Sequence, residues 1–484
     1  MIAAMAAIIT QASPEFPAGL PKPVPGVIPD AGWQQPARLP GHSAYRPATA
    51  SVSPYERVIA VLLPVAAFFL SWWQVGRIPA FNLTMSDILL LVCTLLMLAS
   101  RGLNAAMMGR MSAIWVLGLV MLLGGMLVGS VTHGDSERWP VVAGQYAFAL
   151  LLIPMLLANC SHALLQKCAI AYVLGVAVSQ AIGIAMVNLL SRAAITQYVN
   201  KYVVTGNGRL GAMTGEPNSN GAVCVFALIF LIHAVIDKRL KTVFAVPLAL
   251  VIVAGLVYCA SFTAFTATIL SIGFILAFSR IRTVISIAVP VLLVVTAYVG
   301  LGGPVPAVFE QRVGDAVVTG DPTKAGTFVG RSVLIEEAWQ MSGNNLLIGL
   351  GSDGYRKASS YGMPVHQLYL LVLNEGGIVS FLGLFVMFLA MLVEGLFIAR
   401  RNKAAGVSAL ASLGVFFMYA MSLPHMFARM WNGPVVLMFA LAGAATFTAA
   451  RRERRPRHGS WKPDEREGDE PSLRPQTIRT LEAG

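Results

Sequence analysis

The sequence predicts an all-α polytopic membrane protein with about twelve transmembrane helices and one large periplasmic loop. Hydrophobic residues make up 56% of the 484-residue chain and charged residues only 12%, whereas soluble domains carry about 25% charged residues. The apolar residues gather in runs of about 20, the length of helix that crosses the hydrocarbon layer with its backbone groups hydrogen-bonded. The ionisable residues instead concentrate in a long polar segment from Gly302 to Met363.

The apolar runs define the predicted spans. They lie near residues 57–74, 86–100, 111–130, 140–158, 165–189, 219–236, 242–258, 260–279, 283–301, 377–399, 405–423 and 433–450. Only a very short turn, from Tyr258 to Phe262, separates the seventh span from the eighth. One long bent helix is therefore the alternative there.

The positive residues of the short loops orient these spans, because cytoplasmic loops of membrane proteins carry an excess of Lys and Arg. In this chain they fall on every second connection and after the last span, at Arg101, Arg110, Lys167, Lys238, Arg239, Lys241, Arg280, Arg282, Arg400, Arg401, Lys403 and the arginines from Arg451 to Arg457. We therefore predict that both termini are cytoplasmic. The loops predicted to face outward lie near 75–85, 131–139, 190–218, 302–376 and 424–432.

This layout divides the chain into five regions. They are a proline-rich, flexible cytoplasmic leader (1–54), nine spans (55–301), the large periplasmic loop (302–376), three spans (377–450) and a basic, disordered cytoplasmic tail (451–484). The net charge of +12 then reflects topology and attraction to anionic lipid, not nucleic-acid binding. The five cysteines fall in or beside spans without a CxxC pair, which predicts neither a disulfide framework nor a zinc site.

The first outward-facing segment with chemical interest runs from Gly206 to Gly221 and leads directly into a span. Its glycine and asparagine residues favour tight turns, and Asn218 or Ser219 is expected to cap the helix that follows. Arg209 is the cation of this segment. A capped loop with a surface arginine and an anion-binding loop both fit the pattern.

The second segment lies in the large loop and joins Arg331, in VGRSVLIEEAW, to His366, in PVHQLYLLVLNEGG, through the turn-rich passage GLGSDGY. A histidine at a helix start is ordinarily a cap, but this one shares its predicted membrane face with Arg209, Arg312, Arg331 and Arg356. The planar guanidinium of arginine binds phosphate through two parallel hydrogen bonds. This cluster therefore favours a lipid-borne phosphate or pyrophosphate as the ligand.

A short helix is predicted for Ser332–Met341, between these two residues. Its apolar side chains, among them Leu334 and Trp339, recur on one side, so we expect it to lie on the membrane surface. Glu336 and Glu337 are expected on a solvated side.

The order of these motifs resembles the O-antigen ligase and polymerase superfamily of bacterial envelope glycan assembly. The resemblance covers roughly residues 200–400: an arginine in a glycine-rich loop that opens a span, a large late loop with GR…EEAW, a GxG turn, and a histidine that leads into a span. It implies an enzyme of the bacterial inner membrane that transfers an undecaprenyl-pyrophosphate-linked glycan to a sugar hydroxyl on the periplasmic face. It also implies that Arg209 and Arg331 bind the pyrophosphate and that His366 is the catalytic loop-end histidine. The implied partners are the lipid-linked oligosaccharide, membrane lipids, a chain-length regulator and polysaccharide export proteins.

Two positions depart from the family's pattern. Gln367 follows the histidine where the family often has Asn, and Glu216 precedes the Pro-Asn pair where the family often has Asn. Both are expected to affect acceptor choice. With Arg312, Arg356 and Asn218 they complete the predicted substrate-binding residues.

The implied chemistry needs stabilisation of the leaving pyrophosphate and deprotonation of the acceptor hydroxyl. The predicted outer loops contain no DxD pair for a divalent metal, and fixed arginines supply the same electrostatic stabilisation. We therefore predict a metal-independent enzyme without a cofactor. His366 is the favoured general base or phosphate-orienting group because histidine titrates near neutral pH. The reserve candidates are Glu216, Glu336, Glu337 and Glu375.

Polymerisation of exopolysaccharide or O-antigen repeat units is favoured over ligation of O-antigen to the lipopolysaccharide core, which uses the same donor. A lipid-linked glycan flippase or transporter is the alternative from another class. Transporters place ionisable residues near the bilayer midplane, whereas Asp87 and Glu394 lie close to the ends of their predicted spans. A scaffold for an export complex would leave the arginines and the histidine unexplained.

Overall fold

The computed structural model describes residues 53–74, 76–78, 82–133, 136–278, 281–320, 328–424 and 427–453. Its regular secondary structure in these ranges is helical, apart from two isolated β-bridges. The all-α fold class is thereby confirmed. The predicted leader and tail lie outside the described residues, except for residues 53–54 and 451–453.

Long helices or helix groups occur at the position of every predicted span. They are α2 (Pro54–Phe68), α3 (Met85–Arg101), α4 (Ser112–Thr132), α5 with η4 and α6 (Arg138–Ala147, Phe148–Leu152 and Ile153–Ala158), α7 (His162–Leu189), α9 (Pro217–Ile236), α10 (Thr242–Cys259), α11 (Phe262–Phe278), α12 (Ile281–Gly300), α17 (Leu368–Arg401), α18 (Lys403–Ala420) and α19 (Arg429–Glu453). Within the described residues, eight helical stretches are both long and apolar enough to cross a membrane. These apolar helices support a membrane-embedded protein, and the number of twelve spans stays a prediction.

Shorter helical elements lie in the connections. They are η1 (Phe69–Ser71), η3 (Gly109–Met111), α8 (Arg192–Tyr198), η5 (Ala212–Thr214), α13 (Ala307–Phe309), η6 (Glu310–Gly314), α14 (Asp315–Thr319), α15 (Phe328–Asn344) and α16 (Gly354–Ala358). The segment between 242 and 279 forms two helices, so the alternative of one long bent helix is wrong. Ala260 adopts a left-handed conformation (φ 45°) that ends α10 at Cys259.

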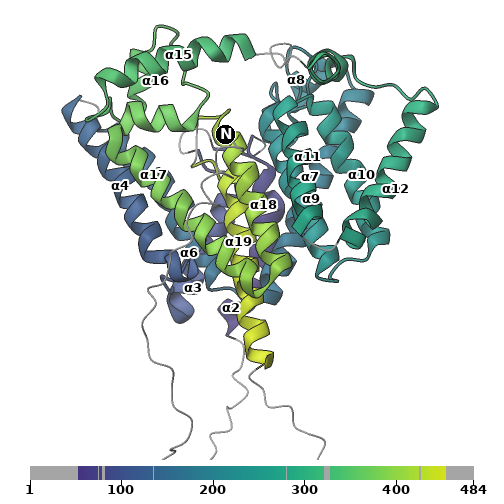
Figure 1. The fold of residues 1–484 in the computed structure, drawn as a ribbon, viewed down its shortest axis with the longest axis horizontal. Helices are drawn as coiled ribbons and strands as arrows, with labels where there is room; N and C mark the ends of the chain where they lie inside the picture. The colour runs from purple at the N-terminus through teal and green to yellow at the C-terminus, as the bar shows by residue number, and fades with distance from the viewer. Residues whose placement is uncertain are drawn as a thin grey trace, which may run out of the picture. The chain divides into compact units, whose positions relative to one another are not determined.

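Helices α4 and α17 lie side by side (Figure 1) because small residues bring their backbones together. A Cβ atom on Gly125 would lie 2.5 Å from the carbonyl oxygen of Gly376, and one on Gly383 would lie 2.5 Å from that of Gly118. Close approach at small residues is a common way for helices to associate in membranes. This pairing carries the segment after the large loop along the whole length of α4.

Helix α17 breaks at Gly377, whose φ of 63° and ψ of −167° are non-helical. Because the helix is broken there, nearby carbonyl groups lack their intrahelical N–H donors. Backbone N–H groups of the GLGSDGY passage donate to them instead. The N–H of Leu350 donates to the carbonyl of Asn374 at 2.8 Å, and that of Gly351 to the carbonyl of Glu375 at 2.9 Å. The turn-rich passage therefore fixes the start of α17, where the histidine motif lies.

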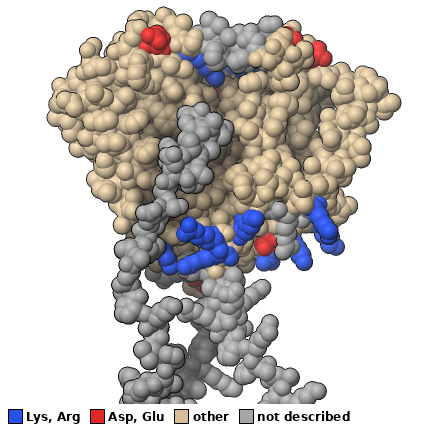
Figure 2. Space-filling view, in the orientation of Figure 1, with Lys and Arg blue, Asp and Glu red and all other residues tan. Residues whose placement is uncertain are grey.

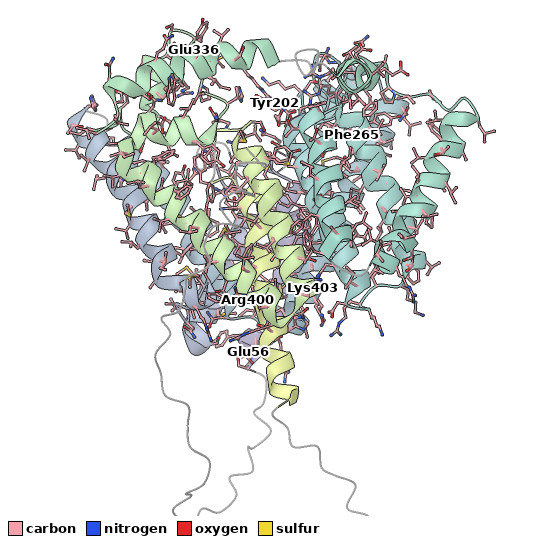
Figure 3. All side chains as sticks on the ribbon, viewed as in Figure 1. Glu56, Tyr202, Phe265, Glu336, Arg400 and Lys403 are labelled. Atoms are coloured by element: carbon pink, nitrogen blue, oxygen red, sulfur yellow. The ribbon has the colours of Figure 1, made fainter. Side chains whose placement is uncertain are left out.

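The two ends of the helical bundle differ in their charged side chains. Lys and Arg side chains gather at one end (Figure 2). That end carries Arg400, Lys403 and Glu56, whereas Glu336 and Tyr202 lie at the other end (Figure 3). This distribution follows the predicted alternation of loops, and the periplasmic location of the second end stays a prediction.

Candidate functional site

Arg209 lies at the end of a short hairpin in the loop before α9. An antiparallel bridge joins Val204 to Leu210, and Gly208 adopts a left-handed conformation with φ of 78°. The N–H of Thr205 donates to the carbonyl of Arg209 at 3.0 Å. The glycine-rich loop thus has a defined backbone that presents one arginine.

The side chain of Arg209 is buried, with 6% of its surface exposed. Its Nε donates to the carbonyl of Cys259 at 2.9 Å and its Nη2 to Oδ1 of Asn218 at 2.9 Å. The Cys259 carbonyl is available because α10 ends there, and the last carbonyls of a helix lack intrahelical donors. The interpretation of Arg209 as a surface arginine is therefore wrong. These two bonds use two of the five N–H donors of the guanidinium.

Asn218 connects Arg209 to the start of α9. Its Oδ1 also accepts from Oγ of Ser261 at 3.1 Å, and its Nδ2 donates to Oε1 of Glu216 at 2.8 Å. Glu216 is the N-cap residue, because its carboxylate accepts from the N–H and the Oγ of Ser219 at 2.6 and 2.9 Å. The expectation that Asn218 or Ser219 caps α9 is therefore wrong. A carboxylate there also interacts favourably with the helix dipole.

Arg312 and Arg331 reach the same region from the large loop. Arg331 lies in the first turn of α15 and Arg312 in η6. Burial lowers the pKa of Arg209, the charges of Arg312 and Arg331 lower it further, and the charge of Glu216 raises it. Burial and the charge of Arg331 likewise lower the pKa of Arg312. We call Arg209, Arg312, Arg331 and Glu216 the arginine cluster.

His366 lies two residues before α17 and beside this cluster. Burial lowers its pKa, the charge of Arg331 lowers it further, and the charge of Glu216 raises it. The imidazole is therefore neutral at neutral pH. Among the described residues, its buried Nδ1 has no hydrogen-bond partner, and neither has Nε of Arg312 or Oε1 of Gln367. Buried polar atoms are normally hydrogen-bonded, so each of these atoms is open to a polar ligand.

Glu337 holds α15, and with it Arg331, against α16 and the turn that follows. Its carboxylate accepts from the hydroxyls of Tyr355 and Ser359 at 3.1 and 2.7 Å, and from the N–H and Oγ of Ser360 at 2.7 Å each. Burial raises the pKa of Glu337, but these hydrogen bonds outweigh burial and lower it overall. The sequence suggested that Glu337 lies on a solvated face, but its carboxylate instead contacts the neighbouring segment.

The apolar side chains of α15 are divided between two environments. Leu334 and Ala338 are buried, and Ala338 packs with Tyr355 and Val365 in one cluster of the protein itself. Trp339, in contrast, is 65% exposed. Part of this apolar side therefore packs against the segment that carries His366, and the location of the helix on the membrane surface stays a prediction.

A polar cavity of about 390 Å³ adjoins the arginine cluster. Each of the five loops predicted to face outward contributes to its lining, through residues such as Arg77, Arg138, Glu216, Arg356 and Trp431. These loops therefore meet at one end of the bundle. Glu216 belongs to both the cavity and the arginine cluster, whereas Arg356 is an exposed residue of the cavity alone.

Ion pairs and ring contacts shape the cavity wall. Arg429 donates through Nε to the buried carboxylate of Asp87 at 2.8 Å, and its guanidinium lies 4.8 Å from the ring centroid of Trp73. Arg77 contacts the same ring at 5.2 Å. Arg138 pairs with Asp353, a turn residue with φ of 58°, at 2.5 Å.

The sequence analysis did not identify several of these residues as parts of a site. Arg77 and Arg138 could have been found, because each is the one Lys or Arg in its predicted outer loop. The Cys259 carbonyl and the Ser261 hydroxyl give no such signal, because any sequence supplies a carbonyl and serine is common in turns.

Comparison with known proteins adds no relative to this description. No family model matches the chain, and no curated protein matches it.

In the part of the chain that the structure describes, no group of three His, Cys, Asp or Glu side chains could hold a metal ion. Metal independence stays a prediction for a direct test.

Proposed function

We propose that the protein binds a polyprenyl-pyrophosphate-linked glycan at the arginine cluster and transfers the glycan to a sugar hydroxyl in the adjoining cavity. One observation carries the proposal. The charges of Arg312 and Arg331 act on Arg209, and the charge of Arg331 acts on Arg312. Glu216 is the acid whose charge acts on Arg209 and Arg331. Partly buried like charges destabilise one another, so the cluster favours an anionic ligand.

The charge of the cluster suits a pyrophosphate. Three arginines and one glutamate leave two positive charges, because His366 is neutral. A pyrophosphate that is esterified at both ends carries one negative charge on each phosphate. Helices α10 and α11 meet at the cluster, since Cys259 ends the first and Phe262 begins the second. The long apolar chain of a lipid-linked donor can therefore lie along these helices.

The proposed chemistry follows from the protonation states. Neutral His366 accepts the proton of the acceptor hydroxyl while the hydroxyl oxygen bonds to the anomeric carbon. The bond from that carbon to the phosphate oxygen breaks at the same time, and the leaving pyrophosphate gains a negative charge. The fixed arginines stabilise this charge, and each such donor contributes about 2.7–4 kcal/mol to lowering the barrier.

Polymerisation of exopolysaccharide or O-antigen repeat units is the favoured form of this reaction. A polymerase uses a second lipid-linked repeat unit as acceptor, and that molecule carries its own pyrophosphate. Arg77, Arg138 and Arg356 line the cavity beside the carboxylates of Glu216, Asp353 and Glu375. Because Arg138 is paired with Asp353, Arg77 and Arg356 are the cations of this lining available to a second pyrophosphate. Ligation to the lipopolysaccharide core remains the alternative with the same donor.

A flippase or transporter has less support. Asp87 is paired with Arg429 through short hydrogen bonds near the ends of α3 and α19, so it is not poised to bind a coupling ion. The unpartnered polar atoms of His366 and Arg312 gather instead at one end of the bundle, as expected for chemistry at the membrane surface.

The test uses Arg209→Ala, Arg331→Ala and His366→Ala in cells that lack the native gene, with Arg282→Ala as the control. Arg282 is exposed and lies at the start of α12, outside the arginine cluster. Each site variant should reduce polymer formation by about a hundred- to a thousandfold at normal membrane protein levels. Normal polymer from all three variants would refute the proposed site.

A reconstituted assay separates the forms of the reaction. Purified protein receives lipid-pyrophosphate repeat units, with or without lipopolysaccharide core, in excess chelator. Lengthening of the lipid-linked glycan indicates a polymerase, and transfer to the core indicates a ligase. Activity that disappears with chelator and returns with magnesium or manganese would contradict the metal-independent mechanism.

A further inference from the structure

A second cavity lies away from the arginine cluster, and the proposed function does not use it. Its volume is about 350 Å³, and its lining includes Arg110, Glu394, Phe397 and Arg401. Helix α17 extends from its break at Gly377 to Glu394 over about 25 Å, so this cavity is remote from His366. Its lining residue Arg401 follows Arg400, which lies at the end of the bundle that carries Lys403 and Glu56 (Figure 3).

Glu394 gives this cavity an unsatisfied acceptor. Its Oε2 is buried and has no hydrogen-bond partner among the described residues. The turn before α4 presses against the carboxylate, since a Cβ atom on Gly109 would overlap it. Gly109 also has a positive φ of 53°, which disfavours other residues. The backbone N–H of Arg110 donates to this carboxylate, but it leaves Oε2 without a donor. A buried acceptor without a donor is destabilising, so a ligand that donates a hydrogen bond to Oε2 would complete the site.

Two cations line the same cavity as this acceptor. Arg110 lies over the ring of Phe397, at 5.8 Å from its centroid, and Arg401 ends α17. Neither arginine forms an ion pair with Glu394 within the described part of the chain. Ala158 and Ile398 add an apolar wall. The cavity thus offers positive charge, a carboxylate and apolar surface side by side.

We propose that this cavity binds the headgroup of an aminophospholipid. Arg110 and Arg401 bind the phosphate, Glu394 accepts hydrogen bonds from the primary ammonium, and the apolar wall contacts the glycerol and upper acyl chains. A headgroup that carries only negative charge offers Glu394 no ammonium group, and its charge repels the carboxylate. A trimethylammonium headgroup has no N–H to donate, so it leaves Oε2 unsatisfied.

Native mass spectrometry of the full chain in detergent tests this site. The protein is titrated with phosphatidylethanolamine, phosphatidylglycerol and phosphatidylcholine of the same acyl chains. The wild type should bind phosphatidylethanolamine about tenfold more tightly than the other two, which corresponds to one charge-assisted contact. Glu394→Gln should remove this preference. Arg401→Ala should weaken the binding of all three lipids alike, because each of them carries the phosphate.

Arg400→Ala is the matched control, because Arg400 is an exposed neighbour that does not line the cavity. It should leave all three affinities unchanged. Equal binding of phosphatidylethanolamine and phosphatidylcholine, or a preference that survives Glu394→Gln, would overturn the proposal. Equally tight binding of soluble glycerophosphoethanolamine would overturn the assignment to a lipid. These results do not depend on glycan transfer, so they leave the proposed function unaffected.

Discussion

Asn218→Ala tests whether the hydrogen-bond network, and not only the charge of Arg209, supports glycan transfer. The change removes partners from Nη2 of Arg209, Oγ of Ser261 and Oε1 of Glu216. Leaving buried polar groups unpaired destabilises a fold by about 1–3 kcal/mol each. Arg209 keeps its bond to the Cys259 carbonyl, so it should stay inserted but lose its fixed orientation. A displacement of about 1 Å at a catalytic group lowers the rate about a hundredfold.

The assay is the transfer rate of purified protein from a lipid-pyrophosphate glycan, together with thermal unfolding in detergent. Rates are compared at a temperature where every variant is folded, which separates positioning from stability. Asn188→Ala is the control, because Asn188 is exposed and bonds to the hydroxyl of Tyr258 at the same end of the bundle. It should keep the wild-type rate. A wild-type rate for folded Asn218→Ala would refute the positioning of Arg209 by Asn218.

Three further predictions follow from the same structure. Burial and the charge of Arg331 lower the pKa of His366, so the transfer rate should stay constant as the pH is lowered to below the ordinary histidine pKa of about 6.5 and should fall only at lower pH. Because the charge of Glu216 raises this pKa, Glu216→Gln should move the fall in rate to still lower pH. A fall in rate that begins at or above a pH of about 6.5 contradicts His366 as the base. Gly125→Val should destabilise the protein by about 1–3 kcal/mol through overpacking between α4 and α17, whereas a Cβ on Gly124 meets nothing within 4 Å; equal thermal unfolding of Gly125→Val and Gly124→Val would disprove the close packing. Glu337→Gln should speed proteolysis near Ser360 at neutral pH, whereas Glu336→Gln should not. Because the pKa of Glu337 is lowered in the folded protein, the stability that this carboxylate contributes is present above the ordinary glutamate pKa and is lost as the pH falls through the folded pKa. Equal protection from proteolysis in both variants would argue against this contact.

The sequence predicted the helices and the grouping of the outer loops well, because both depend on local patterns. A run of about 20 apolar residues has few stable conformations in lipid other than a helix. The alternation of Lys and Arg among short loops then assigns each loop to one side. Since Arg77, Arg138, Glu216, Arg356 and Trp431 line one cavity, the five loops grouped by this rule do meet at one end.

What the sequence by itself determined is therefore the positions of the long apolar helices, the grouping of the outer loops and the choice of Arg209, Arg331 and His366 as candidates. Only the tertiary structure decided how these side chains are held. Arg209 is fixed by the backbone carbonyl at the end of α10, and the start of α17 is fixed by backbone bonds that the break at Gly377 makes possible. Every residue carries the same carbonyl and N–H groups, so sequence patterns cannot reveal which of them meet across the fold.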